Sequence, residues 1–232
     1  MSWHLGRMCG FDLETTGTDV EADRIVTATV VQVGGGQPVI AADWLADPGI
    51  DIPEGAASVH GITTDTARTK GRPAAEVVAD VLAALGQVVA AGIPVVAMNA
   101  RYDLTLLDRE AARYGLAALP AGPVIDPLVL DKHVDRYRRG KRNLTALCEH
   151  YRVELGAAHT SSADAVAACR VAWRIGHTRP QLAAMPLDEL HTAQVGWAAE
   201  QAASLQAHLR KTDPAAYCAP EWPLIPRQQN GA

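Results

Sequence analysis

The sequence predicts an α/β domain built around a mixed β-sheet. Three stretches of β-branched or alternating apolar residues open the chain and are separated by turn-forming residues, a pattern typical of antiparallel strands. Behind them, segments with helical periodicity alternate with two short apolar runs, and this order is typical of α/β folds. Together these observations predict a mixed five-stranded sheet flanked by helices.

The first three strands are predicted from the period of their side chains. Residues 8–14 alternate apolar and other side chains, so Asp12 and Glu14 should share one face of a strand. Residues 25–33 form a second, β-branched run, and a Gly-Gly-Gly-Gln-Pro turn leads into a third run at 39–45. Two hairpin-like connections in succession predict an antiparallel start to the sheet.

The helices are predicted from their periodicity and from the residues at their ends. Pro73 favours a helix start, because the first turn of a helix does not need the N–H that proline lacks. This helix should run to about Ala91. The remaining predicted elements are, in order, a buried strand at 93–98, a helix at 101–114 ended by Gly115, a strand at 124–125, and helices at 127–135, 143–150, 162–176 and 187–210.

A chain of 232 residues fits one ordinary domain with an extension. We expect this domain at residues 1–180 and a helical extension, packed on or near it, at 181–212. The last segment, 213–232, contains four prolines and should be an extended tail.

The composition limits the classes of function. The net charge of -5 gives no overall attraction to nucleic acid, so a polyanion would have to bind through a local patch or through metal ions. The four cysteines lack C-x-x-C spacing and are expected to be reduced thiols. No signal-peptide pattern is visible, and the longest apolar run, 88–98, is too short for a bilayer. We therefore expect a soluble, cytoplasmic protein without membrane contact.

Three acidic segments carry the candidate functional residues. Asp12 and Glu14 are followed by Thr-Thr-Gly, and a tight turn there would present hydroxyl and N–H groups beside the acids. Half-exposed strands also carry alternating acids without any function. Asp103 follows the buried strand at 93–98 and falls in the first turn of a helix, where a carboxylate stabilises the helix by roughly 0.3–1 kcal/mol.

The third segment contains His159 and Asp164. Ser161 and Asp164 are spaced like a capping box, so a helix start explains Asp164 as well as a catalytic role does. A histidine just before a helix is more often structural than catalytic. Asn99, ahead of Asp103, has the residue type of a helix N-cap. Each acidic segment taken singly is therefore ambiguous.

The three segments in this order resemble the DEDDh group of 3′–5′ exonucleases, the DnaQ-like superfamily. It includes the proofreading subunit of bacterial replicative polymerase, ribonuclease T and oligoribonuclease. Three further segments match the pattern of this group: Val59 to Thr63 in a loop before the long helix, Ile125-Asp126, and Asn143-Leu144 at a helix start. The resemblance covers roughly residues 8–176 and implies a ribonuclease-H-like fold.

The chemistry of such a site requires cations. Carboxylates about 4 Å apart repel each other by roughly 4 kcal/mol per pair at an effective dielectric constant near 20, and hard oxygen ligands favour Mg²⁺ or Mn²⁺. The resemblance implies two such ions, with Asp12 bridging both. It places Glu14 and Asp164 on the ion beside the attacking water, Asp103 on the other ion, and His159 as the base that takes the proton of the water. The product would be a nucleoside 5′-monophosphate.

The resemblance also implies substrate contacts for Thr15, Thr16, His60 and Asn99, which should meet the terminal nucleotide of a single-stranded 3′ end. For His60, a purely structural role in its loop is an equally good interpretation. Asp126 should support the site without binding metal.

The segment 132–142 holds six of the 21 basic residues. A solvated helix end is the ordinary interpretation of such a run, but a phosphate-tracking patch beside the cleft is favoured here because the rest of the chain is acidic. The apolar stripe of the last helix is more typical of core packing than of a partner surface. The alternatives for this stripe are a homodimer or docking onto a polymerase or helicase partner.

Three functions compete with a DNA 3′–5′ exonuclease. An exoribonuclease or oligoribonuclease would use the same acids, and only tolerance of a 2′-hydroxyl would distinguish it. A non-catalytic nucleic-acid-binding module would usually lack one of the carboxylates, and all of them are present. A metal-free hydrolase with Asp12 and Glu14 as an acid/base pair would leave Asp103 and Asp164 without a role.

Overall fold

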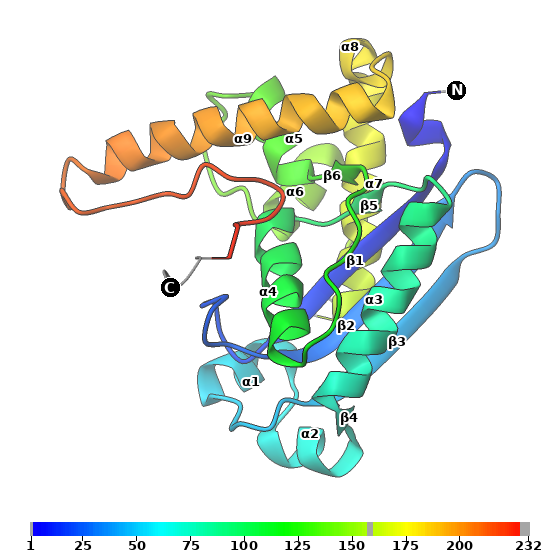
Figure 1. Ribbon diagram of the computed structural model, residues 1–232. Helices are drawn as coiled ribbons and strands as arrows, with labels where there is room; N and C mark the ends of the chain where they lie inside the picture. Colours follow the sequence, from blue (N-terminus) through cyan, green and yellow to red (C-terminus); the bar gives the residue numbers. More distant parts are fainter. Residues whose placement is uncertain (1, 157–159, 228–232) are drawn as a thin grey trace.

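The computed structural model describes residues 2–156 and 160–227, and Figure 1 shows the arrangement of its elements. Within these residues the chain forms one mixed sheet with the strand order β4-β3-β2-β1-β5-β6. The strands are β1 (Arg7–Thr15), β2 (Ile25–Gly34), β3 (Ile40–Asp47), β4 (Arg72–Pro73), β5 (Val95–Val96) and β6 (Val124–Ile125). Strands β1 to β3 pair antiparallel, whereas the pairs β1–β5, β5–β6 and β3–β4 are parallel.

This sheet confirms the predicted α/β class and its mixed pairing. The difference is β4, a two-residue strand beside β3 that adds a sixth strand to the predicted five. Its length explains the omission, because two residues carry no alternation from which a strand could be predicted. The predicted antiparallel start is also found, and Gly34, Gly35 and Gly36 adopt positive φ in the turn between β2 and β3, a conformation open to glycine.

Helices cover both faces of the sheet. The helices are α1 (Glu54–His60), α2 (Thr64–Lys70), α3 (Ala74–Ala90), α4 (Ala100–Arg113), α5 (Pro127–Val134), α6 (Leu144–Tyr151), α7 (Ser161–Thr178), α8 (Pro180–Ala183) and α9 (Leu187–Leu209), with a 3-10 turn η1 at Trp3–Leu5. Helices α3 and α4 pack on one face of the sheet, and α7 packs on β1 and β2 from the other. The apolar side chains of β1, such as Phe11, face α3 and α4, which leaves the carboxylates of β1 on the face covered by α7.

The segment before α3 differs from the expected loop. Val59 and His60 end α1, and Thr63 caps the start of α2 by accepting a hydrogen bond from the Thr66 backbone N–H. Between them Gly61 adopts a left-handed conformation with φ of 77°. Two helices of seven residues each, fixed by their end groups, therefore occupy the place of that loop.

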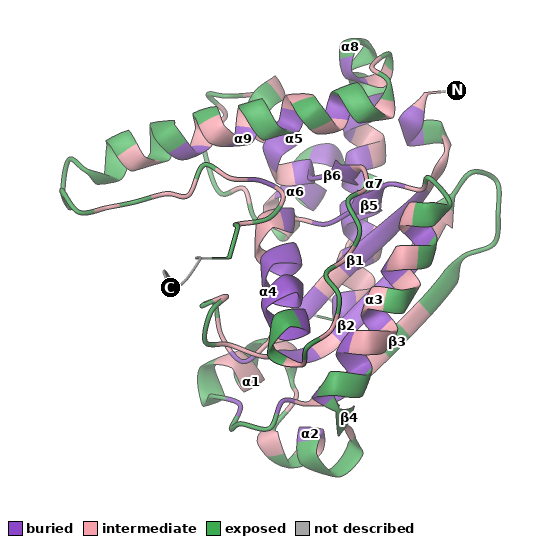
Figure 2. Cartoon of the chain, in the orientation of Figure 1, coloured by how far each residue is buried: buried purple, intermediate pink, exposed green. Residues whose placement is uncertain are grey.

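The C-terminal segment packs on the rest of the molecule. Helix α9 buries Leu190, Gln194, Ala198 and Ala202, and the chain then turns back below it (Figure 1). Trp222 in this returning segment is 5% exposed and belongs to the core around α3 and α4. Figure 2 shows α4 buried along most of its length. Among the described residues, no helix is long and apolar enough to cross a membrane.

Candidate active site

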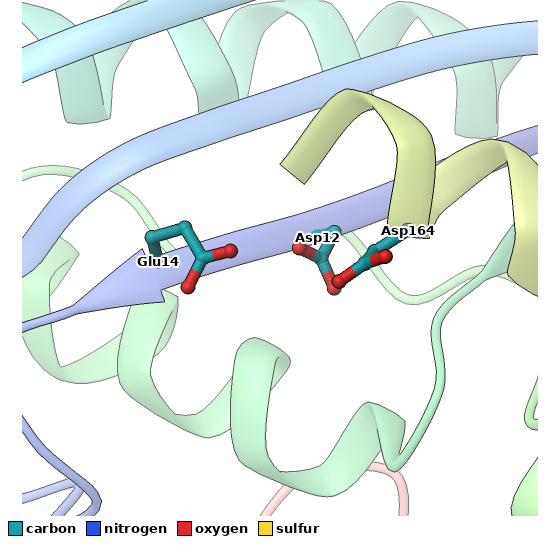
Figure 3. A group of neighbouring side chains, drawn as sticks. All are labelled: Asp12, Glu14 and Asp164. Atoms are coloured by element: carbon teal, nitrogen blue, oxygen red, sulfur yellow. The ribbon is translucent and has the colours of Figure 1, made fainter. Parts of the chain in front are cut away.

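Three carboxylates from two elements meet on the α7 face of the sheet. Asp12 and Glu14 lie two residues apart on β1, and Asp164 lies in the first turn of α7. One oxygen from each of the three lies within 4.8 Å of the others. In Figure 3 the carboxylates of Asp12 and Asp164 point toward each other, with that of Glu14 directed to the same space. All three side chains are partly exposed, so a ligand can reach them.

The close approach of α7 to β1 depends on Gly10. A Cβ at this position would lie 2.4 Å from the backbone oxygen of Ala165, closer than real Cβ atoms come to backbone. Ala165 directly follows Asp164. Glycine therefore lets the helix lie near enough to the strand for Asp164 to join Asp12.

Side chains across the sheet hold the first turn of α7. Thr160 is the N-cap and accepts a hydrogen bond from the Ala163 N–H, so the capping residue is Thr160, and not Ser161 as the capping-box spacing predicted. The Ser161 hydroxyl lies 2.8 Å from the hydroxyl of the fully buried Thr29 on β2, which donates in turn to Asp43 on β3. This chain of hydrogen bonds fixes the start of α7, and with it the position of Asp164.

Asp103 reaches the same region from α4. Its side chain is 4% exposed and accepts a hydrogen bond of 3.2 Å from the backbone N–H of Leu13, which lies between Asp12 and Glu14. The electrostatic effect of Asp103 contributes to the raised pKa of Asp12. The fourth predicted carboxylate thus lies near Asp12 and Glu14, although the group within 4.8 Å contains only Asp12, Glu14 and Asp164 among the described residues.

Asp126 stabilises the start of α4. Its carboxylate accepts hydrogen bonds from the backbone N–H groups of Asn99 and Ala100, at 3.1 and 3.0 Å. Asn99 occupies the N-cap position with φ of 63°, and its side chain makes no capping hydrogen bond. The capping role that its residue type predicted is therefore wrong: Asp126 satisfies these N–H groups instead. Asn99 itself is exposed.

The acids strongly disfavour full ionisation when no cation is present. Burial raises the pKa of Asp12 well above its usual range, and the charges of Asp103, Asp164 and Glu14 raise it further. Burial also raises the pKa of Asp103, although the hydrogen bond from Leu13 opposes this. Burial and the neighbouring Asp164 raise the pKa of Glu14 to about 7. A divalent cation would offset the repulsion, and hard carboxylate oxygens are the donors that Mg²⁺ and Mn²⁺ prefer.

The predicted substrate residues have different surroundings. The Thr15 hydroxyl donates to the Gly17 backbone oxygen and lies 2.7 Å from the Tyr102 hydroxyl. Thr16 is 2% exposed, its hydroxyl donates to Asp23, and its N–H donates to the backbone oxygen of Arg24. Both donors of Thr16 are used inside the fold, and the substrate contact expected of this residue stays a prediction.

His60 is half-buried at the end of α1, and its Nδ1 accepts a hydrogen bond of 3.1 Å from the Ile62 N–H. Burial lowers the pKa of His60, and the Thr15 backbone opposes this effect, so the ring lies close to the strand end that carries the acids.

His159 lies outside the described residues. The contacts of the Tyr102 hydroxyl with Thr15 and Gly17 were not predicted from the sequence, although Tyr102 lies next to Asp103.

A family model described as exonuclease (RNase_T) matches residues 9–172. A DNA polymerase III PolC-type protein of Halalkalibacterium halodurans is 31% identical over 166 residues, which cover 71% of this chain and 11% of that protein. A DNA polymerase III subunit epsilon-like protein of Rhodobacter capsulatus is 32% identical over 173 residues, covering 71% of this chain and 23% of that protein. This chain thus spans between about a tenth and a quarter of the length of these relatives.

Solved structures of exonuclease I have the same fold. One superposes with a TM-score of 0.65 at 20% identity, and the E. coli enzyme in complex with a dA16 oligonucleotide superposes with a TM-score of 0.64 at 19% identity. Each match covers 76% of this chain and 42% of the other. At this level of identity the likeness concerns the fold alone.

Proposed function

Since the chain belongs to the exonuclease family whose model matches residues 9–172, we propose that it removes nucleotides one at a time from the 3′ end of DNA. The reaction would hydrolyse the terminal phosphodiester bond and release a nucleoside 5′-monophosphate. Two divalent cations, Mg²⁺ or Mn²⁺, would assist it.

The observation that carries this proposal is the meeting of Asp12, Glu14 and Asp164 within 4.8 Å. Such a set of hard oxygen donors fits a divalent cation, and the raised pKa values of Asp12 and Glu14 have the direction expected of a site that needs positive charge. Bound cations supply Lewis-acid stabilisation of the attacking and leaving oxygens of a phosphoryl transfer.

Each acid has a distinct place in the proposed site. Asp12, central on β1, would be shared between the two cations. Glu14 and Asp164 would help to bind the cation beside the attacking water, and Asp103 would help to bind the other cation. His159 would take the proton of the attacking water, a task suited to an imidazole with an ordinary pKa near 6.5.

DNA is proposed as the substrate because the relatives above carry the names of DNA polymerase III proteins. For the same reason we propose that the chain works with a polymerase. RNA remains the alternative substrate. Matched DNA and RNA strands of one sequence, labelled at the 5′ end, distinguish the two: a DNA exonuclease should digest the RNA strand at least tenfold more slowly.

The decisive experiment follows a 5′-labelled single strand with Asp12→Asn and a matched control, Asp188→Asn. Asp188 is an exposed carboxylate at the start of α9. The wild type and the control should produce a ladder of strands shortened from the 3′ end and should stop when EDTA is added. Asp12→Asn should produce no ladder. Turnover that survives either EDTA or this substitution would refute the two-cation proposal.

A further inference from the structure

A groove with several basic side chains runs between α5 and α9, which lie side by side in Figure 1. It has a volume of about 620 Å³, and its lining includes Lys132, Arg136, Trp197, Gln201 and His208. We call it the α5–α9 groove. Helix α9 begins at Leu187, beyond the end of the family match at residue 172.

A second hollow adjoins the α5–α9 groove at the start of α4, the helix that carries Asp103. This hollow, of about 260 Å³, shares Lys132 and Gln201 with the groove and is also lined by Asn99 and Arg101. Both of these residues lie at the start of α4, and Arg101 precedes Asp103 by two positions. Neither hollow is lined by Asp12, Glu14, Asp103 or Asp164, so a strand whose 3′ end lies at the carboxylates would pass over the start of α4 to reach the groove.

The groove lining carries more positive than negative charge, with Glu200 as the carboxylate beside Lys132, Arg136 and Arg142. In the basic segment 132–142, Arg138 and Arg142 form ion pairs with the buried Asp131, so these two cations have a structural role. Lys132 and Arg136 take part in none of the ion pairs found in the described part of the chain. Burial lowers the pKa of Lys132. The positive charges of Arg142 and Arg101 lower this pKa further, whereas the charges of Asp126 and Asp131 raise it. A bound anion would relieve this repulsion.

A flat surface lies in the same groove. The rings of His133 and Trp197 stack with their centroids 3.6 Å apart and their planes inclined by 16°. His133 is exposed, and Trp197 is half-buried between the core and the groove. Aromatic rings beside cations are a common means of binding single strands without regard to sequence, because every base has a face that can stack on a ring.

We propose that the α5–α9 groove binds the single strand upstream of its 3′ end. This inference rests on the proposed function. In it, α9 and the end of α5 bind the part of a longer strand that extends beyond the carboxylate site. Charge complementarity favours a nucleic-acid strand, since the groove is locally positive on a chain of net charge -5.

The test compares Arg136→Ala with Arg139→Ala, which removes another exposed cation, three residues away, that does not line the groove. Fluorescence anisotropy in EDTA would give the Kd of a labelled oligothymidylate of about 20 nucleotides at several salt concentrations. Arg136→Ala should lower the slope of log K against log salt by about 0.7 and weaken binding roughly fivefold at 0.1 M salt. Arg139→Ala should match the wild type. For a trinucleotide the difference between the two variants should shrink.

Equal Kd values and salt slopes for the two variants would overturn the inference. So would an acidic decapeptide that binds in an Arg136-dependent way while the oligothymidylate does not, because the groove would then serve a protein partner. Binding in EDTA requires no turnover, so the result is independent of the nuclease assay. Should the wild type digest no strand and still show Arg136-dependent binding, the proposed function would fail, and the groove would be a single-strand binding site without a role at the 3′ end. Lys132→Gln supplies a second groove variant.

Discussion

The raised pKa of Glu14 links the stability of the protein to pH. In the fold this pKa is about 7, against 4.5 for an ordinary glutamate. The folded state therefore holds a proton that the unfolded chain has released, and stability falls as pH rises between these two values. We expect the Tm of the protein in EDTA to fall from pH 4.5 to pH 8, with Asp12 and Asp103 acting in the same direction.

Divalent cations should reverse this loss, because they bind the ionised acids of the folded state only. Thermal unfolding at pH 8 with and without Mg²⁺ tests this, and the raised Tm should disappear in Asp12→Asn. Glu14→Gln should flatten the pH profile measured in EDTA. A Tm in EDTA that rises over the same pH range would contradict the assignment of Glu14.

His159→Ala should reduce the rate by roughly 10²–10⁴, the range typical of a lost general base, and leave cation affinity largely unchanged. At saturating Mg²⁺ the acids stay ionised, so the wild-type rate should still rise with pH through about 6–7 as the imidazole loses its proton. A rate that does not change over this range would assign the proton to another group.

Single residues differ in how far the sequence reveals their roles. The shared face of Asp12 and Glu14 follows from an alternation of two, which the sequence displays directly. The surroundings of Thr16 and Ser161 cannot be inferred from such an alternation. Thr16 forms a hydrogen bond with Asp23 in the following loop, and Ser161 forms one with Thr29, which is 132 positions away. Such hydrogen bonds exist only after the chain has folded.

At the scale of elements, the spacing between β1 and α7 controls the cation site. Gly10→Ala places a Cβ against the backbone of Ala165, so α7 must shift outward and carry Asp164 with it. We expect cation affinity to fall at least tenfold, measured by titration calorimetry with Mn²⁺.

The matched control is Gly86→Ala in α3, where a Cβ meets nothing within 4 Å. This change should raise stability by about 0.5–1 kcal/mol, because alanine is the better helix former, and should leave cation affinity unchanged. Equal cation affinity in Gly10→Ala and in the wild type would show that the close approach is not required.

Most elements were predicted correctly from the sequence, including the two-residue strand β6 and the eight-residue helices α5 and α6. The strands β1 to β3 and the helices α3, α4, α7 and α9 lie within about two residues of their predicted bounds. Helices α1, α2 and α8 were missed because a helix of four to seven residues shows too few turns for an apolar face to appear. In these short helices the residues at the two ends determine where the helix begins and ends.

At the scale of the whole molecule, the C-terminal segment is part of the folded core. Trp222 is 5% exposed and donates a hydrogen bond of 3.2 Å from its Nε1 to Asp126. Arg227 forms an ion pair with Asp108 on α4. Trp222→Ala should cost roughly 3–5 kcal/mol, as for other buried aromatic residues, measured by urea unfolding.

Trp222→Phe keeps most of the packing and removes only the hydrogen bond to Asp126, so it should cost about 1–3 kcal/mol. Tyr217→Ala, at a side chain that is 70% exposed, is the control and should change stability by less than about 0.5 kcal/mol. A loss in Trp222→Ala no larger than in Tyr217→Ala would show that the tail contributes little to the fold.

The fold class and the resemblance to 3′–5′ exonucleases, both inferred from the sequence, are confirmed by the mixed sheet and by the family match at residues 9–172. The surface that the C-terminal segment covers could not be inferred, because a proline-rich segment has no periodic pattern of apolar residues that would indicate its contacts. The contact between Trp222 and Asp126 joins positions 96 residues apart.

The hydrogen bonds of Asp126 also predict which positions should change together in related sequences. Its backbone N–H donates to Gln194 on α9, and its carboxylate accepts from Trp222, so two partners of this aspartate lie beyond residue 172. Relatives that lack both partners should change at the position of Asp126 as well, or supply substitute polar groups from elsewhere. In an alignment, the three positions should therefore co-vary, with the residues at 194 and 222 gained or lost together.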